Sequence, residues 1–328
     1  MIKTSVIIVN YNGFGVIIDC LAKLSEQTAK NYEVLVVDNA SVDDSLAKIR
    51  SMFPTVKVLA LDANLGFTGG NIAGLKQARG EYIALLNPDT EVSPDWLLNL
   101  ERVMESHPEA GICASKLLVY GSDIIDSAGD GCLVTGRGYK IGEGENHSQY
   151  NELRQVFGAC GGAMLIRRAV IDQVGFLDDD FFLIYEDTDF NFRVRMAGWQ
   201  CFYAPEAVVW HKVRSSIGTM SSLAVYYSVR NAKYVLFKNM PWILILKYLP
   251  HLLVQEVASF CYFVVRHRKW TTYFKANCDF IREIPRLLHK RRQVMKTQKI
   301  KDKTLENMLT PLFDRTMLRK KIDKLLRG

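Results

Sequence analysis

The sequence lacks the features that mark several classes of protein. Its seven cysteines are scattered and include no CxxC pair, which favours reduced thiols in a cytosolic compartment over a disulfide framework. The strongly apolar stretch 241–265 is broken by charged and proline residues, so it falls short of the roughly 20 clean apolar residues of a membrane-spanning helix. The opening MIKTSVIIVNYN turns polar too soon for a signal peptide.

Negative charge is scarce in the last fifth of the chain. Residues 1–265 carry 23 Lys and Arg against 29 Asp and Glu, a net charge of −6, whereas residues 266–328 carry 19 against 6, a net charge of +13. A segment of this kind is expected to contact something anionic, such as nucleic acid, phosphorylated lipid or a membrane surface.

The first hundred residues alternate β-branched apolar runs with helical stretches. The runs are TSVIIVN, YEVLVVD, VKVLALD and EYIALLN, and a glycine-rich segment, NLGFTGGNIAG, follows the third. This alternation predicts an α/β domain with a mostly parallel central sheet. Ligands bind such sheets at the carboxyl ends of the strands, and polar residues fall at or just past these ends: Asn10, Asp38, Asn64 and Asp89.

The C-terminal region, 236–328, is predicted to be helical, basic and partly amphipathic. Its apolar part is followed at once by Arg266, Arg268 and Lys269. Apolar helices beside cationic ones favour a region that lies on or dips into an anionic leaflet. The alternative is a helical subdomain that packs on the core or on a dimer partner.

Acidic residues end an apolar run in FFLIYEDTDFNFRVRMAGW, which starts at Phe181. A buried carboxylate is costly unless it is paired or used. Asp189 and Arg193 are spaced to pair on a helix that ends at Gly198, so Asp189 is expected to be structural. Helix capping is the simplest explanation for Glu186 and Asp187.

Six segments occur in an order that resembles the family 2 inverting glycosyltransferases, in particular the rhamnosyltransferase-like branch. They are SVIIVNYN, VVDNASVDDS, NLGFTGGNIAG, LLNPDT, GACGGAMLIRR and YEDTDFNFRVRMAGW, within residues 4 to about 235. The resemblance implies a GT-A fold for a catalytic domain at 1–235, a nucleotide-diphosphate-sugar donor and a divalent metal, Mg²⁺ or Mn²⁺.

The resemblance also implies roles for residues that bind the donor and the metal. Asp89 is the one carboxylate left to hold the metal, because Asn87 stands where the family's acidic motif has its first acid. His211 matches a position that can supply a further ligand, although an isolated histidine after a strand is more often a core residue. The residues expected to line the donor are Asn10, Asn12, Asp38, Asn64, Gly69, Asn71 and Asn87.

For the acceptor side, the resemblance makes Asp187 the general base and Glu186 a neighbour that contacts the acceptor or positions the base. The apolar residues 181–185 are expected to raise the basicity of Asp187 by excluding water. Gly161 and Gly162 resemble a small-residue turn beneath the acceptor. Cys160 is expected to be a buried thiol rather than a nucleophile, because an inverting single displacement needs none.

These observations predict a metal-dependent inverting glycosyltransferase. The first choice of donor is dTDP-rhamnose, with a UDP-hexose as the alternative; a nucleotidyltransferase or a protein that binds nucleic acid through the basic tail is less favoured. The acceptor is expected to be a lipid-linked or cell-surface glycan. The expected location is the cytoplasmic side of an anionic membrane, as a peripheral or monotopic protein without a nucleic-acid partner, and homo-oligomer formation is left open.

Overall fold

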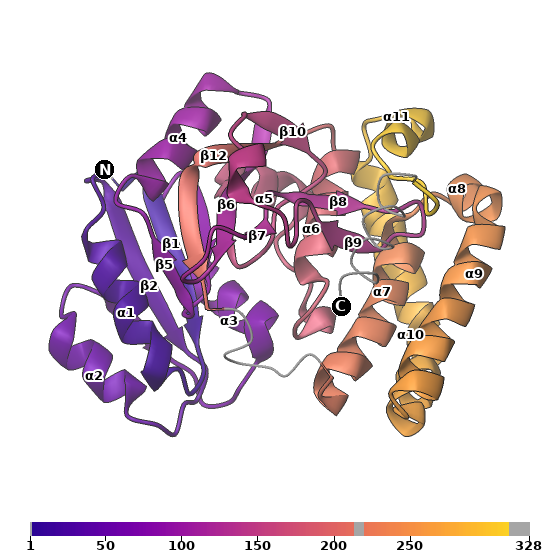
Figure 1. Ribbon diagram of the computed structural model, residues 1–328, viewed down its shortest axis with the longest axis horizontal. Helices are drawn as coiled ribbons and strands as arrows, with labels where there is room; N and C mark the ends of the chain where they lie inside the picture. The colour runs from indigo at the N-terminus through magenta and orange to yellow at the C-terminus, as the bar shows by residue number, and fades with distance from the viewer. Residues whose placement is uncertain (1, 213–219, 315–328) are drawn as a thin grey trace.

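The computed structural model describes residues 2–212 and 220–314. A twisted sheet with helices on both faces occupies one side of the molecule, and a group of C-terminal helices stands at the opposite side from α1 and α2 (Figure 1). The predicted α/β class is confirmed.

The first four strands form the parallel part of the sheet, in the order β3-β2-β1-β4. Every residue of β1 is buried, as its continuous apolar run predicts for a strand covered on both faces. The expected helical stretches between the strands are present as α1, α2 and α3. The elements are β1 (Thr4–Asn10), α1 (Phe14–Ser25), β2 (Tyr32–Asp38), α2 (Ser45–Met52), β3 (Lys57–Ala60), α3 (Gly66–Leu75) and β4 (Tyr82–Leu86).

Beyond β4 the sheet becomes mixed. Strand β11 pairs antiparallel with both β4 and β6, and β12 runs parallel to β6. A two-stranded hairpin, β8 with β9, lies outside this sheet. The elements are β5 (Thr90–Val92), α4 (Trp96–Ser106), β6 (Ala110–Val119), β7 (Ile125–Ser127), β8 (Asp130–Cys132), β9 (Gly138–Lys140), η1 (His147–Gln149), β10 (Arg154–Val156), β11 (Ala163–Arg167), α5 (Arg168–Val174), η2 (Asp179–Phe181), α6 (Glu186–Met196) and β12 (Gln200–His211).

Helix α6 joins the sheet to the C-terminal helices. Its Phe190 and Val194 pack in the core beneath the sheet, whereas Phe192 and Met196 pack with residues of α7 and α10. Since apolar side chains leave α6 on both sides, the helix is buried almost along its whole length. The C-terminal elements are α7 (Ser222–Asn239), α8 (Trp242–Lys247), α9 (Leu249–Phe260), the π-helix η3 (Cys261–Arg266), α10 (Trp270–Thr297) and α11 (Asp302–Asn307).

The C-terminal helices pack on the core, as the alternative sequence interpretation has it. The domain boundary expected at 235/236 lies inside α7. Lys290 on α10 pairs with Asp178, Asp179 and Asp180, which precede α6. Part of the positive charge of the tail is therefore paired inside the protein.

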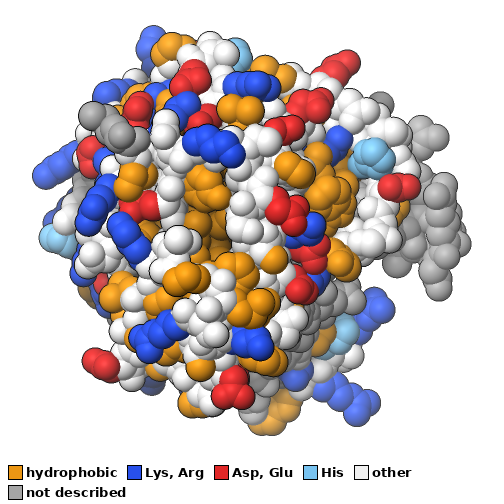
Figure 2. Space-filling view, turned by 90° about the vertical axis from the view of Figure 1, so that its left-hand side faces the viewer, with side chains coloured by type: hydrophobic (Ala, Val, Ile, Leu, Met, Phe, Trp, Pro, Cys, Tyr) orange, Lys and Arg blue, Asp and Glu red, His pale blue; other side chains and the backbone are white. Residues whose placement is uncertain are grey.

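Two surface properties bear on the expected partners. Cationic and anionic side chains are interspersed on the face that contains α1 and α2 (Figure 2). Within residues 2–212 and 220–314, none of the helices combines the length and apolar character needed to cross a bilayer.

Candidate active site

The ends of β1 and β2 are tied together by side-chain amides and carboxylates. Asn10 donates from Nδ2 to Asp38 Oδ1 at 3.0 Å and to Ser45 Oγ at 2.9 Å. Both Asn10 and Asp38 are buried, so the bonds that they make here hold the rim of the sheet in place. Asn12 lies on the surface of the same rim, where its Oδ1 accepts from Val42 N at 2.8 Å.

The turn before α3 is held by two asparagines. Asn64 Oδ1 accepts from Gly66 N and from Asn39 Nδ2, each at 2.8 Å. Gly66 has a φ of +72°, and a Cβ there would lie 2.4 Å from the Phe182 carbonyl oxygen, so glycine is required. The turn therefore packs directly against the segment that leads to Glu186 and Asp187.

Helix α3 contributes two more of the candidate donor residues, Gly69 and Asn71. A Cβ on Gly69 would lie 2.5 Å from Leu65 Cβ, so this position also needs glycine. Asn71 is buried and donates to Phe67 O at 2.9 Å, while its Oδ1 has no hydrogen-bond partner in the part of the chain that the structure describes. A buried amide oxygen of this kind is rare and marks a place where a ligand or water would be held.

Asp89 and His211 face each other from the ends of neighbouring segments. His211 Nε2 lies 3.4 Å from Asp89 Oδ1, and His211 Nδ1 lies 2.9 Å from Asp126 Oδ2. Burial would lower the pKa of His211, but hydrogen bonds to Asp126 and Asp89 outweigh it and raise the pKa to about 9.

This arrangement fits a divalent cation. Asp126 holds one ring nitrogen and leaves the other beside the Asp89 carboxylate, which is the carboxylate–histidine arrangement that orients metal ligands in proteins. A carboxylate oxygen with an imidazole nitrogen suits Mn²⁺ or Mg²⁺. Asp89 and His211 would hold the ion, for which the protonated ring of His211 would have to give up its Nε2 proton, and Asp126 would fix the ring through Nδ1.

The sequence interpretation missed Asp126, together with Asp130 and Lys140. Lys140 Nζ lies 2.7 Å from Asp126 Oδ1. Burial, reinforced by the charge of Asp187, raises the pKa of Asp130 to about 7. The two acids are visible in the sequence as part of IIDSAGDGC. They lie in a segment of short strands whose apolar residues show no regular spacing, so the sequence did not single them out.

The Asn87 and Asp187 motifs meet at the glycine turn between β10 and β11. Asn87 N donates to Gly162 O at 2.8 Å, and Gly161 N donates to Asp187 Oδ2 at 3.0 Å. A Cβ on Gly162 would lie 3.2 Å from Asn87 Nδ2, and one on Gly161 would lie 3.4 Å from the Phe67 ring. The two adjacent glycines thus bring the donor-side and acceptor-side motifs together.

Helix capping accounts for Glu186 and Asp187 only in part: both lie in the first turn of α6, where Asp187 Oδ1 accepts from Thr188 N at 2.6 Å, but Glu186 Oε2 has no partner within the described part of the chain. The N-cap position of α6 is Tyr185, and no side chain caps it. The turn before the helix is strained, because Phe182, Ile184 and Tyr185 all have positive φ, between 58° and 75°. Strain of this kind persists only where the surroundings enforce it.

Asn231 of α7 holds the strained turn. Its Nδ2 group lies within hydrogen-bond distance of three carbonyl oxygens: 3.0 Å from Phe181 O, 2.9 Å from Leu183 O and 2.7 Å from Ile184 O. Arg230 orients the amide by donating to Asn231 Oδ1 at 2.9 Å. Because Asn231 is fully buried, water does not replace these bonds.

Ion pairs formed by residues of α6 and α7 also stabilise the region of the turn. The expected pair of Asp189 with Arg193 is present, at 2.9 Å, and both side chains are buried. Lys238 pairs with Asp189 at 2.7 Å and also reaches Asp178. Burial would raise the pKa of Asp178, but Lys238 and Lys290 outweigh it and hold the pKa well below its usual range.

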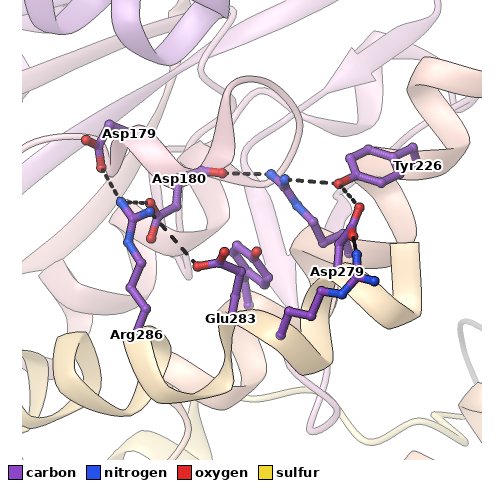
Figure 3. Close-up of a pocket in the computed structure, with 9 residues that line it drawn as sticks. Asp179, Asp180, Tyr226, Asp279, Glu283 and Arg286 are labelled. Atoms are coloured by element: carbon purple, nitrogen blue, oxygen red, sulfur yellow. Dashed lines mark hydrogen bonds and ion pairs between the residues drawn. The ribbon is translucent and has the colours of Figure 1, made fainter. Parts of the chain in front are cut away.

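A cavity of about 340 Å³ lies between α7, α10 and the acidic segment 178–180 (Figure 3). Arg286 points across it to Asp179 and Asp180, and Tyr226 donates to Asp279. Asp178, Asp179 and Asp180 are close enough to hold a cation, but lysine and arginine side chains already neutralise them. The ion pairs beside the cavity therefore attach α10 to the acidic segment 178–180.

The acid that the protein shields from water is Glu186 rather than Asp187. Glu186 is buried, and its Oε2 has no hydrogen-bond partner among the described residues, whereas Asp187 is partly exposed. Burial, with the charge of Asp187, raises the pKa of Glu186 from its ordinary 4.5 to about 8. The side chain made more basic by the apolar run is therefore Glu186, and this glutamate is protonated at neutral pH.

Glu186→Gln is expected to remove a pH dependence of stability. The folded state binds a proton at Glu186 up to about pH 8, whereas the unfolded state loses it near 4.5, so wild-type stability falls as pH rises through this window. At pH 8.5 the variant should be more stable than wild type by roughly 3–5 kcal/mol relative to their difference at pH 4, where both states of the wild type bind the proton. Urea unfolding at both pH values measures this, and the same difference at both would contradict it.

Cys160 is not placed to act as a nucleophile. Burial raises the pKa of its thiol well above the usual range, with the charge of Asp130 adding to the effect. Its sulfur lies near one oxygen each of Asp130 and Asp187, all within 4.8 Å of one another. Cys160 is partly buried rather than fully buried as expected from the sequence, and its protonated thiol lies beside two carboxylates.

A sequence profile of glycosyl transferase family 2 matches residues 5–175. An uncharacterized protein of Sinorhizobium fredii, y4gI, is 34% identical over 203 residues, 57% of this chain and 22% of that protein, so the match spans about a fifth of that relative. N-acetylglucosaminyl-diphospho-decaprenol L-rhamnosyltransferase of Mycobacterium tuberculosis is 28% identical over 221 residues, 60% of this chain and 72% of that protein.

Solved structures share the fold. TarS 1-349 of S. aureus in complex with UDP-GlcNAc matches with a TM-score of 0.57 and 16% identity, over 93% of this chain and 91% of that one. GalNAc-T7 with UDP, GalNAc and Mn²⁺ matches with a TM-score of 0.58 and 18% identity, over 73% of this chain and 50% of that one. At these identities the likeness establishes the fold alone.

Proposed function

The chain belongs to glycosyl transferase family 2, and on that premise we propose that it transfers a sugar from a nucleotide donor to an acceptor hydroxyl with inversion at the anomeric carbon. The fold is the expected GT-A fold. The observation that carries the proposal is the turn at Gly161 and Gly162, which hydrogen-bonds to Asn87 on one side and to Asp187 on the other. Family membership favours this function over a nucleotidyltransferase or a nucleic-acid-binding protein.

In the proposed reaction Asp187 is the general base. The acceptor oxygen forms a bond to the anomeric carbon as the bond from that carbon to the diphosphate oxygen breaks, and the hydroxyl proton passes to Asp187. Gly161 N donates to Oδ2 of Asp187 at 3.0 Å and Thr188 N donates to Oδ1 at 2.6 Å, so two backbone amides orient the carboxylate, and the proton would go to a remaining lone pair. Glu186, protonated beside it, keeps a second negative charge away from the base and offers a hydrogen bond to the acceptor.

The nucleoside diphosphate leaves with new negative charge. A divalent cation, when bound, would offset this charge without proton transfer. Asp89 and His211 are the residues proposed to hold it, and Asp126 to orient His211. The remaining candidate donor residues, around Asn12 and Asn64, lie on the same rim of the sheet.

The donor proposed first is dTDP-rhamnose, with UDP-hexoses next. The named rhamnosyltransferase among the relatives supports rhamnose, and the UDP-GlcNAc complex of TarS supports the alternative. The name of the Mycobacterium tuberculosis relative, N-acetylglucosaminyl-diphospho-decaprenol L-rhamnosyltransferase, also supports a lipid-linked acceptor. We propose a lipid-linked or cell-surface glycan acceptor at the cytoplasmic side of a membrane.

A donor panel tests the function. The full chain is incubated with dTDP-rhamnose, UDP-glucose, UDP-GlcNAc and GDP-mannose in the presence of Mn²⁺ or Mg²⁺, and nucleoside diphosphate release is measured. One donor should be turned over well above the rest, and EDTA should reduce its turnover by at least about 100-fold. Release that is equal with and without EDTA would count against the metal, and release from no donor would count against the transferase.

Asp89→Ala is the matching variant. It should weaken donor binding in the presence of Mn²⁺ by about tenfold or more and leave the weak binding in EDTA unchanged, because the carboxylate acts through the ion. Titration calorimetry with and without EDTA separates the two. Asp95→Ala, at the start of α4, is the control and should bind donor as wild type does.

A further inference from the structure

Helix α9 presents polar side chains to the protein and apolar side chains outward. Gln255 and Ser259 are buried, whereas Leu253 and Val257 are 60% and 63% exposed. Surface helices of soluble proteins have the opposite arrangement, with the apolar face against the core. The outer face of α9 therefore has the chemistry of a surface that another apolar body covers.

Hydrogen bonds and one ion pair fix α9 in this orientation. Thr135 donates to Gln255 Oε1, and Arg137 donates to Ser259 Oγ at 2.6 Å; both partners lie in the turn between β8 and β9. Lys233 of α7 pairs with Glu256 at 2.7 Å. Rotating α9 to hide its apolar face would break all three contacts and bury unpaired polar groups.

The exposed apolar positions form one stripe along α8, α9 and η3. Five of them recur at helical spacing and are 47% to 68% exposed: Leu246, Leu249, Leu253, Val257 and Val265; Ile243 and Val254, on the same helices, are also exposed. We call the five the apolar stripe. Trp242 and Trp270 stand exposed beyond its two ends. Helices α8 and α9 form the outer edge of the molecule, on the side opposite α1 and α2 (Figure 1).

Cations surround the apolar stripe. Between residues 240 and 277 the single acid is Glu256, which is paired, and the bases are Lys247, Arg266, Arg268, Lys269 and Lys275. A groove of about 770 Å³ next to Trp242 continues the apolar surface, with the exposed Arg292 and Lys296 among its lining residues. A second copy of the chain would bring like charges together, whereas anionic headgroups would pair with them.

We propose that the apolar stripe is the surface by which this protein lies on an anionic lipid bilayer. Helix α9 lies in the plane of the interface, with the stripe among the upper acyl chains and the two tryptophans at headgroup level. Arg292 and Lys296 contact lipid phosphates. The inference rests on the exposed apolar face and the cations around it, and not on sugar transfer. It places the apolar contact on α8, α9 and η3 rather than on the basic residues that pair with the core.

Vesicle binding by the full chain tests this inference. Vesicles of phosphatidylcholine alone, or of phosphatidylcholine with phosphatidylglycerol, are sedimented with wild type, Leu253→Glu/Val257→Glu or Arg292→Glu/Lys296→Glu. The partition coefficient of the first variant on anionic vesicles should be at least about tenfold lower than that of wild type, because the variant places charge in the acyl region. The second should lose the preference for anionic over neutral vesicles.

The control is Met52→Glu/Leu153→Glu, which makes the same charge change at two exposed apolar residues outside the C-terminal helices and should bind as wild type. Leu246→Glu repeats the test at another position of the stripe. Equal binding by wild type and the stripe variants, or no binding by wild type, would overturn the proposal. So would a mass by light scattering that halves in the stripe variants, since the stripe would then join two copies. No donor or acceptor is present, so the result is independent of sugar transfer.

Discussion

Asp187→Asn is expected to lower kcat of sugar transfer by about 10³-fold while the donor dissociation constant stays within about twofold. Asparagine has the shape of aspartate, and its amide oxygen can still accept from the Gly161 amide, although Thr188 N, which donates to Asp187 Oδ1 at 2.6 Å, loses its acceptor. What is lost is the ability to take the acceptor proton. The donor contacts proposed on the sheet rim do not involve this side chain.

Rates under donor saturation and calorimetric donor binding measure the two quantities separately. Asp172→Asn, on the exposed face of α5, makes the same chemical change away from the site and should retain wild-type rates. Turnover within tenfold of wild type would remove Asp187 as the base. Donor binding lost together with activity would indicate a structural role instead.

Glu186→Gln tests whether Glu186 differs from the neighbouring Asp187 in its protonation state. Because Glu186 is protonated at neutral pH, glutamine replaces it with a group of similar shape and the same charge. The two acids therefore differ in protonation and in burial, although they are adjacent in sequence. Their order in the chain predicted neither property, since burial depends on how α6 packs between the sheet and α7.

Local patterns predicted the parallel half of the sheet correctly. The apolar runs that became β1, β2 and β4 are continuous, and a strand buried on both faces needs nothing else to define it. The pairing of Asp189 with Arg193 was predicted for the same reason, because one helical turn sets their separation. In each of these cases the information lies within a few residues.

Contacts between distant segments were not predictable in this way. Asp126 meets His211 across 85 residues, and nothing in the sequence near either one indicates the other. The net charge of the tail predicts contact with something anionic, such as nucleic acid or a membrane, yet Lys290 pairs with Asp178 of the same chain across 112 residues. The net charge of a segment gives its excess of cations over anions. It does not indicate which of these cations form ion pairs within the protein.

The same limit applies to α9. Its composition predicted a helix near a membrane, but the direction of its apolar face depends on Thr135 and Arg137, more than a hundred residues earlier. A helix with the same residues and the opposite rotation would be an ordinary core helix. The structure distinguishes the two cases because it shows which side chains are hydrogen-bonded to the rest of the protein.

Asn231→Ala is expected to destabilise the protein by roughly 2–4 kcal/mol, because it removes the amide donor that Leu183 O and Ile184 O share with Phe181 O, and of these three only Phe181 O keeps another donor within the described chain, Leu183 N. It should also reduce kcat by about 10- to 100-fold with little change in donor affinity, since Phe182, Ile184 and Tyr185 would relax from positive φ and move the carboxylate that follows. Asn231 is a positioning residue in this account, acting on Asp187 through the backbone. Urea unfolding, kcat and donor calorimetry below the melting temperature give the three values.

Asn231→Asp separates hydrogen bonding from packing. Aspartate fills the same volume and can still accept from Arg230, but it has no amide donors for the three carbonyl groups. If the donors matter, Asp should be at least as damaging as Ala; if filling the space matters, Asp should resemble wild type. Asn277→Ala, which loses one bond to Tyr273 O within α10, should keep the wild-type kcat. A normal kcat in both Asn231 variants would mean that α6 alone sets the position of Asp187, and the C-terminal helices would then have no part in aligning the base.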